Sequence, residues 1–126
     1  MDGWIGVDFD GTLAVYNGWN GGKLGEPVKA MVDRVKRWLS EGKKVKVFTA
    51  RVGIGGGYSL ESGKTDTGEF AEEQRKAIQE WCKEHIGQAL EVTATKDFLM
   101  YQMWDDRAVT VEVNTGRILS SMDFEK

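Results

Sequence analysis

The chain has 126 residues, of which 40% are hydrophobic and 29% charged, and its formal net charge is −3. This length predicts a single domain over residues 1–126, without a second folded lobe. The acidic balance excludes a general attraction to nucleic acid, no apolar run is long enough to span a membrane, and the single cysteine, Cys82, excludes an internal disulfide.

The first predicted strand covers the apolar residues 4–7 and leads into Asp8-Phe9-Asp10-Gly11-Thr12-Leu13. Met1-Asp2-Gly3 precedes this strand directly, so we expect no signal peptide and a cytoplasmic location. An Asp-x-Asp-Gly segment is a good polar turn, because aspartate bonds its own backbone and glycine adopts positive φ. Two carboxylates at this spacing can also converge on one metal ion, and the choice between these interpretations depends on the rest of the chain.

A glycine-rich loop is expected over residues 14–26, where Tyr16 and Trp19 could stack on a substrate or pack over the sheet edge. Apolar residues then recur at helical spacing over residues 28–39, with Pro27 suited to the first turn and Gly42 to the end. Residues 45–48 are rich in β-formers and predict a second strand, which ends at Thr49.

A second glycine-rich loop is expected over residues 51–68, and both loops are candidate flaps over a substrate. Helical periodicity follows over residues 70–86, with Asp66 as a possible N-terminal cap paired with Glu69. Short strands are predicted at residues 90–93, 101–104 and 108–113, the last before the turn Asn114-Thr115-Gly116. This alternation predicts an α/β fold, a three-layer Rossmannoid domain whose mostly parallel sheet carries helices on both faces.

Polar side chains follow each predicted strand at the edge where such sheets bind ligands. They are Asp8 and Asp10 after the first strand, Thr49 after the second, Lys96 after the third, and Asp105 and Asp106 after the fourth. Each is suited to binding phosphate or a hard cation, which favours the catalytic interpretation of the aspartate pair over the polar turn.

In this order the segments resemble the four motifs of the haloacid dehalogenase-like (HAD) superfamily of phosphohydrolases. Asp8-Phe9-Asp10-Gly11-Thr12 resembles the first motif, Val47-Phe48-Thr49 the second, Lys96 the third and Trp104-Asp105-Asp106 the fourth. The proline that follows the lysine in many relatives is replaced here by Asp97-Phe98. The resemblance covers roughly residues 3–113 and implies a small member with a minimal cap or none.

The resemblance implies a role for each residue. Asp8 is expected to be the nucleophile that forms an aspartyl-phosphate, and Asp10 the acid and then the base. Thr49 and Lys96 are expected to bind phosphate. Mg²⁺ is the expected cofactor, held by the carboxylates of Asp8 and Asp105 and by the main-chain carbonyl of Asp10. Asp106 is either a ligand through water or an orienting group.

The expected function is therefore Mg²⁺-dependent hydrolysis of a phosphomonoester. The substrate could be a nucleotide, a sugar phosphate or a polynucleotide end, no membrane partner is expected, and the oligomeric state stays open. The alternative is a regulatory module of the same fold that binds metal or phosphate without turnover. A receiver-like phospho-acceptor domain fits less well. Its acidic pair comes early and its phosphorylated aspartate lies mid-chain, whereas the additional acidic pair of this chain, Asp105 and Asp106, comes late.

Overall fold

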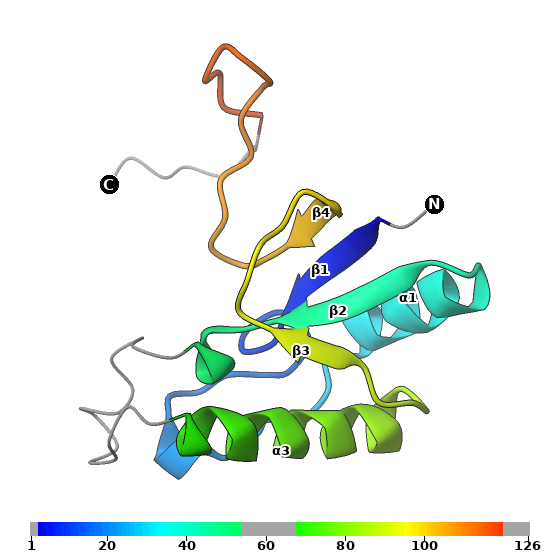
Figure 1. Ribbon diagram of the computed structural model, residues 1–126, viewed down its shortest axis with the longest axis vertical. Helices are drawn as coiled ribbons and strands as arrows, with labels where there is room; N and C mark the ends of the chain where they lie inside the picture. Colours follow the sequence, from blue (N-terminus) through cyan, green and yellow to red (C-terminus); the bar gives the residue numbers. More distant parts are fainter. Residues whose placement is uncertain (1–2, 54–67, 120–126) are drawn as a thin grey trace.

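The computed structural model describes residues 3–53 and 68–119. Its centre is a four-stranded sheet in the order β3-β2-β1-β4, and every neighbouring pair of strands is parallel (Figure 1). The strands are β1 (Trp4–Asp8), β2 (Lys44–Phe48), β3 (Glu91–Thr93) and β4 (Met100–Trp104). The predicted α/β class and parallel sheet are confirmed, and four of the five predicted strands lie within one residue of their expected limits.

In the described part of the chain, two α-helices connect the strands, α1 (Lys29–Ser40) and α3 (Glu69–His85), with short 3-10 turns at η1 (Asn20–Gly22) and η2 (Ala50–Val52). Both α-helices are amphipathic, and each buries one stripe of side chains. In α1 the buried residues are Met31, Val32, Val35 and Trp38, and in α3 they are Ala71, Ile78, Trp81 and Cys82. Gly42 follows α1 with a φ of 81°, as expected for a glycine that ends a helix.

One face of the sheet packs on both helices. Val7 aligns with Val47 on one side and with Trp104 on the other, so these three side chains share a face. Trp104 contacts Trp38 of α1 with ring centroids 5.1 Å apart. Phe9, at the end of the same face, meets Trp81 of α3 edge to face at 5.0 Å. This shared core holds the carboxyl ends of β1, β2 and β4 in fixed positions.

The opposite face differs from the expected helical covering. Trp4 lies on this face and is only 1% exposed, and its indole N–H donates to Asp97 at 2.9 Å. The Lys46 ammonium lies 4.4 Å from the centre of the Trp4 ring. Within residues 3–53 and 68–119, this face is thus covered by the β3–β4 connection and long side chains instead of a helix. The reason is the short connection, since residues 94–99 leave no room for a helix of several turns.

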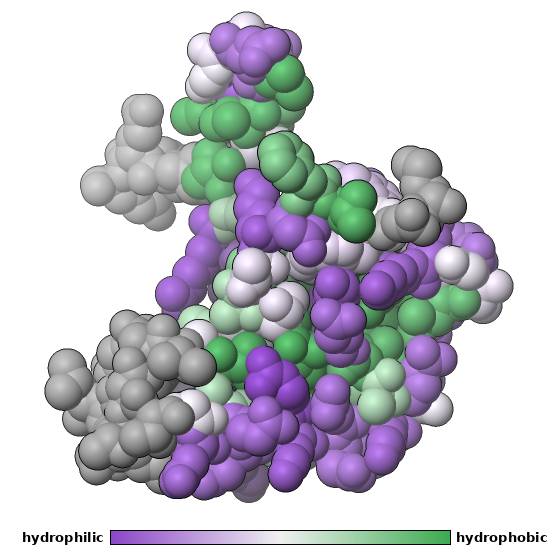
Figure 2. Space-filling model, viewed as in Figure 1, coloured by the Kyte–Doolittle hydropathy of each residue, from purple (hydrophilic) through white to green (hydrophobic). Residues whose placement is uncertain are grey.

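The segment after β4 is also unlike its prediction. Residues 108–113 were predicted as a strand, but the structure forms only an isolated bridge between Val111 and Ile118. The predicted turn is present, with Asn114 and Gly116 at positive φ. This arm, residues 108–119, extends away from the sheet (Figure 1), and Figure 2 shows apolar side chains on it. Those at least 40% exposed are Val109, Val111, Val113, Ile118 and Leu119.

The first predicted loop, residues 14–26, returns to the start of α1, and Ala14 forms an antiparallel bridge with Pro27. Most of the second predicted loop and the proposed cap residue Asp66 lie outside the described residues, and Gly68 is the residue that precedes α3. In the described part of the chain, no helix is long and apolar enough to cross a membrane.

Candidate active site

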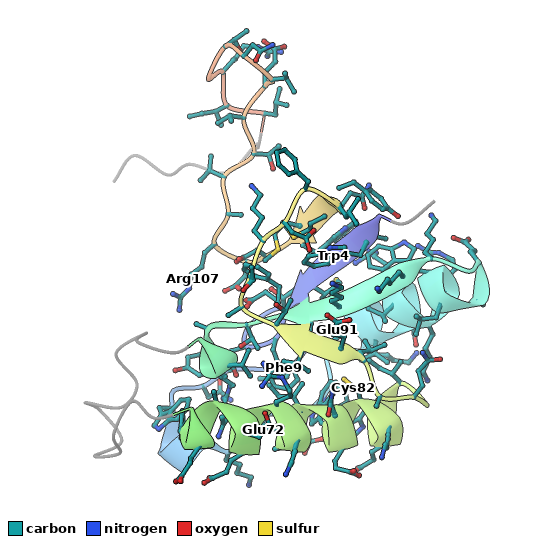
Figure 3. The ribbon with its side chains drawn as sticks, in the orientation of Figure 1. Trp4, Phe9, Glu72, Cys82, Glu91 and Arg107 are labelled. Carbon is teal, nitrogen blue, oxygen red and sulfur yellow. The ribbon has the colours of Figure 1, made fainter. Side chains whose placement is uncertain are left out.

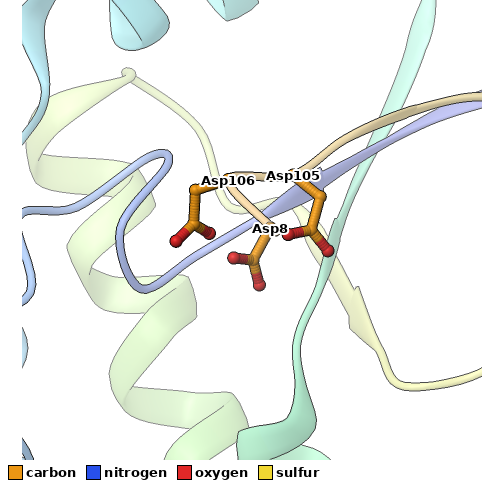
Figure 4. Close-up of side chains that lie close together, drawn as sticks. All are labelled: Asp8, Asp105 and Asp106. Atoms are coloured by element: carbon orange, nitrogen blue, oxygen red, sulfur yellow. The ribbon is translucent and has the colours of Figure 1, made fainter. Parts of the chain in front are cut away.

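Three carboxylates meet at the carboxyl edge of the sheet. Asp8 is the last residue of β1, and Asp105 and Asp106 directly follow β4. Because β1 and β4 are parallel neighbours, with Val7 paired to Trp104, both strands deliver their acidic residues to the same point. One ligand oxygen from each of the three carboxylates lies within 4.8 Å of the others, and the side chains converge in Figure 4.

This crowding changes the protonation of Asp8. Burial raises its pKa, the hydrogen bond with Asp106 and the charges of Asp105 and Asp106 raise it further, and the result is a pKa of about 8. Burial also acts to raise the pKa of Asp106, but hydrogen bonds with Asp8, its own backbone and Thr12 outweigh it and lower the pKa. Without a cation, the cluster therefore retains a proton on Asp8 near neutral pH.

A tight turn after β1 holds Asp106 in place. The backbone N–H groups of Leu13 and Ala14 both donate to the carbonyl of Phe9, at 3.0 and 2.9 Å. Thr12 Oγ1 donates to Asp106 Oδ1 at 3.2 Å and accepts from the Asp106 backbone N–H at 3.0 Å. At Gly11, where φ is 86°, an added Cβ would lie 2.7 Å from Asp106 Oδ2. The turn thus needs glycine for both its conformation and its contact.

Beside the acidic cluster is a pocket of about 190 Å³. It is lined by residues from the ends of three strands: Asp8, Asp10, Phe48, Thr49, Ala50, Asp105 and Arg107. Thr49 follows β2, is 3% exposed, and its hydroxyl accepts a hydrogen bond from the Arg51 backbone N–H at 3.2 Å. That bond leaves the hydroxyl proton of Thr49 available to a ligand oxygen.

The side chain of Asp10 lines the same pocket but is paired with a buried arginine. Arg51 Nε donates to Asp10 Oδ2 at 2.7 Å, and Arg51 Nη2 donates to Asp10 Oδ1 at 2.8 Å. This is the two-pronged geometry that suits a guanidinium and a carboxylate. Asp10 is therefore not a side-chain member of the acidic cluster, where Asp106 takes the third position.

Arg51 is itself fixed from three directions and is only 1% exposed. Its Nη1 donates to the carbonyl of Gly22 at 2.9 Å and to Gln74 Oε1 at 2.8 Å. Its guanidinium carbon lies 4.7 Å from the centre of a ring of Trp19. Trp19, one of two aromatic residues considered as substrate-stacking groups, thus packs on Arg51.

Among the described residues, the cation that lines the pocket is Arg107. Its backbone N–H donates to Asp105 Oδ1 at 2.7 Å, which links it to the acidic cluster. Figure 3 shows its side chain projecting from the carboxyl edge of the sheet. Lys96, expected to bind phosphate, is exposed in the β3–β4 connection and is not among the residues that line the pocket.

The cluster has the chemistry of a divalent-cation site. Three carboxylates supply hard oxygen ligands, which Mg²⁺ prefers. Burial, the hydrogen bond with Asp106 and the charges of Asp105 and Asp106 raise the pKa of Asp8, as expected where carboxylates crowd together. Asp8, Asp105 and Asp106 are therefore the residues that would hold such an ion.

Sequence reasoning missed three groups of this site: Thr12 as the partner of Asp106, Arg51 as the partner of Asp10, and Arg107. Arg51 gave one signal, because an arginine between Ala50 and Val52, three residues after a predicted strand, would need a partner if it were buried. The distance of 41 positions between Arg51 and Asp10 hid that partner.

Comparison with known proteins gives a fold relative. No protein-family model matches the chain, and a search of curated proteins also gives no match. A solved structure, a conserved protein from Bacteroides thetaiotaomicron, has a similar fold with a TM-score of 0.54 and 21% sequence identity. The similar region covers 83% of this chain and 76% of that one. At this identity the comparison supports the Rossmann-like α/β fold and carries no information on activity.

Proposed function

We propose that the chain is a Mg²⁺-dependent phosphomonoester hydrolase of the HAD type that works through an aspartyl-phosphate. The observation that carries this proposal is the convergence of Asp8, Asp105 and Asp106 within 4.8 Å beside the pocket that also contains Asp10 and Thr49. The order of these residues along the chain agrees with the motifs of that superfamily.

The chemistry divides one displacement into two. An oxygen of Asp8 attacks phosphorus and the bond from phosphorus to the leaving oxygen breaks. Asp10, which enters this step protonated, gives its proton to the leaving oxygen. Asp10 then takes a proton from a water molecule that attacks the same phosphorus. The bond from phosphorus to Asp8 breaks, so that inorganic phosphate leaves and the carboxylate is restored. A bound Mg²⁺ offsets the negative charge of the phosphate and the carboxylates.

Other residues bind the substrate in this proposal. The Thr49 hydroxyl donates to a phosphate oxygen, and the side chain of Arg107 neutralises phosphate charge from the rim of the pocket. Lys96 stays a prediction for the same task. The described site has no large covering domain, which favours phosphate groups on bulky substrates without excluding nucleotides or sugar phosphates.

The test is a phosphatase screen of nucleotides, sugar phosphates, an aryl phosphate and oligonucleotides with 3′- or 5′-phosphate, with and without Mg²⁺. We expect Mg²⁺-dependent release of phosphate by the wild-type chain and none by Asp8→Asn. Asp33→Asn is the matched control, because Asp33 is an exposed residue of α1 that pairs with Lys29. Absence of turnover across the panel, together with Mg²⁺ binding, would favour the non-catalytic module instead.

A further inference from the structure

The ion pair of Arg51 with Asp10 joins a buried cation to a carboxylate that faces the pocket, an arrangement that a purely structural ion pair does not need. Arg51 is buried, whereas the side chain of Asp10 keeps 19% of its surface exposed and lines the pocket. The cation thus lies behind the carboxylate, on its protein side. A carboxylate offers about four lone-pair positions, and the two Arg51 bonds use one on each oxygen. Asp10 therefore keeps acceptor positions for a proton that comes from the pocket.

A two-pronged pair also fixes the orientation of the carboxylate. A single hydrogen bond lets a carboxylate rotate about its Cβ–Cγ bond, whereas two parallel bonds hold its plane. Proton transfer depends on such alignment, and a misplacement of about 1 Å can cost roughly a hundredfold in rate. Lysine has the same charge as arginine but only one nitrogen, so it cannot hold the plane in this way.

Arg51 in turn depends on two other parts of the chain. Gly22 belongs to the first glycine-rich loop and Gln74 to α3, and each accepts a hydrogen bond from Nη1. Trp19, from the same loop as Gly22, packs on the guanidinium. The orientation of Asp10 is thereby linked to the position of the loop that borders the site.

We propose that Arg51 is a positioning residue, which fixes Asp10 for proton transfer and is itself fixed by Gly22, Gln74 and Trp19. This inference rests on the proposed function, because it assigns Asp10 the proton transfers of the two displacement steps. Arg51 acts through Asp10 and touches neither the phosphate nor the metal.

The test is Arg51→Lys, assayed with an aryl phosphate and an alkyl phosphate. With the alkyl phosphate we expect kcat to fall about 10- to 100-fold with KM within about threefold, because the substrate contacts remain and only proton transfer is misaligned. With the aryl phosphate KM should fall together with kcat, because the slowed step is hydrolysis of the intermediate. An aryl leaving group needs little protonation, so its first step continues while hydrolysis of the intermediate slows. With ³²P-labelled aryl phosphate, acid-quenched Arg51→Lys should therefore carry more label than wild type, whereas alkyl phosphate should give no such increase.

The matched control is Arg75→Lys, since Arg75 pairs with Glu72 on α3 outside the pocket and the chemical change is the same. Its kcat should stay within about twofold of wild type. A normal kcat for Arg51→Lys, or a raised KM with kcat unchanged, would overturn the proposal, the second result because it indicates direct substrate binding. Absence of turnover by the wild-type chain would instead be a failure of the proposed function.

If circular dichroism shows that Arg51→Lys does not fold, a second variant tests the positioning role of Arg51. Gln74→Leu removes one of the two acceptors of Nη1 and leaves the Arg51–Asp10 pair intact. A fall in kcat of about 2- to 10-fold, with KM unchanged, supports the positioning role. An unchanged kcat contradicts it.

Discussion

The raised pKa of Asp8 bears on how the proposed metal ion would bind. The Asp8 pKa of about 8 in the metal-free protein, against an ordinary value of 3.8, means that the folded chain binds about one more proton than the unfolded chain between these two values. The free energy of unfolding of the metal-free protein therefore falls as pH rises from the lower of these values to the higher. The folded state binds the Asp8 proton more tightly than the unfolded state, and it loses this advantage as the proton leaves. Binding of the proposed Mg²⁺ would reverse the trend, since the ion would replace the proton.

The first prediction concerns this exchange. As pH rises toward 8, the dissociation constant for Mg²⁺ should fall about tenfold for each pH unit, and above pH 8 it should level off. Calorimetry in two buffers of different ionisation enthalpy measures the number of protons released for each Mg²⁺ bound. This number should be near one at pH 6.5 and small at pH 9. Asp33→Asn should behave like the wild type. A pH-independent affinity between pH 6 and 8 would contradict the acidic-cluster assignment.

The second prediction separates the two candidate phosphate cations. Arg107→Ala should lower kcat/KM for a phosphomonoester about 10- to 100-fold, because a charge-assisted hydrogen bond contributes about 1.5–3 kcal/mol. Lys96→Ala should change it less than about threefold, as expected for an exposed side chain outside the pocket. The reverse ranking would restore Lys96 to the role that the sequence motif predicts. Steady-state kinetics on one phosphoester substrate suffices for the comparison.

At the scale of single residues, the sequence predicted the groups that follow strands and missed those whose role depends on a distant partner. Asp8, Thr49 and Asp105 lie at the carboxyl edge because parallel strands end there. Arg51 and Thr12 act through Asp10 and Asp106, and these pairings arise from tertiary packing, which no local pattern encodes. Lys96 shows the converse, since its place after a strand did not bring it to the pocket.

At the scale of elements, the turn after β1 joins the first strand to the residues that follow the last. Gly11 lies against the Asp106 carboxylate, and Thr12 bonds to it, so the conformation of this turn sets the position of one carboxylate in the cluster. A side chain at Gly11 would meet both a strained backbone and a close oxygen.

The third prediction uses this double effect. Gly11→Ala should destabilise the fold by about 1–2 kcal/mol through its positive φ and should also weaken Mg²⁺ binding by displacing Asp106. Gly42→Ala is the matched control, because Gly42 has a similar φ of 81° with no atom within 4 Å of the added Cβ. It should show the loss of stability alone. Thermal unfolding and Mg²⁺ titration of both variants make the comparison, and equal Mg²⁺ affinities would contradict a role for the Gly11 contact.

The elements themselves were largely predictable, because their patterns are regular. Apolar periodicity predicts both α-helices and four strands, and the apolar residues of these elements pack together in the core. Residues 108–113 show the same alternation of Val109, Val111 and Val113, but no strand of the described sheet lies beside them. A β pattern without a neighbouring strand gives only a bridge.

At the scale of the whole molecule, the acidic cluster is held by the sheet, whose core includes a buried free thiol. Cys82 is 0% exposed, and burial raises its pKa to about 11, so it reacts only when the core opens. Cys82 lies on α3, whereas the carboxylates follow β1 and β4. The rate at which a thiol reagent labels Cys82 therefore reports on opening of the core rather than on a local change at the acidic cluster.

The fourth prediction follows from ligand linkage. Saturating Mg²⁺ should slow the labelling of Cys82 by a thiol reagent, since the ion binds the folded state and lowers the population of open forms. At a concentration of 100 times the dissociation constant, the slowing should approach about a hundredfold if opening is global. Asp105→Asn should lose most of this effect while Cys82 stays buried. Labelling that Mg²⁺ leaves unchanged would mean that α3 opens independently of the sheet edge.

The distance along the chain between the parts of the cluster has a consequence for synthesis. Thr12 and Asp106 are in contact although 94 positions separate them, and the other carboxylates divide in the same way between the beginning of the chain and the residues after β4. A ribosome-bound chain therefore displays Asp8 long before it contains the acidic residues that complete the cluster. Chains released before residue 105 would contain Asp8 but neither Asp105 nor Asp106. The three carboxylates that the proposed cation site needs are therefore present together only in chains that extend past β4.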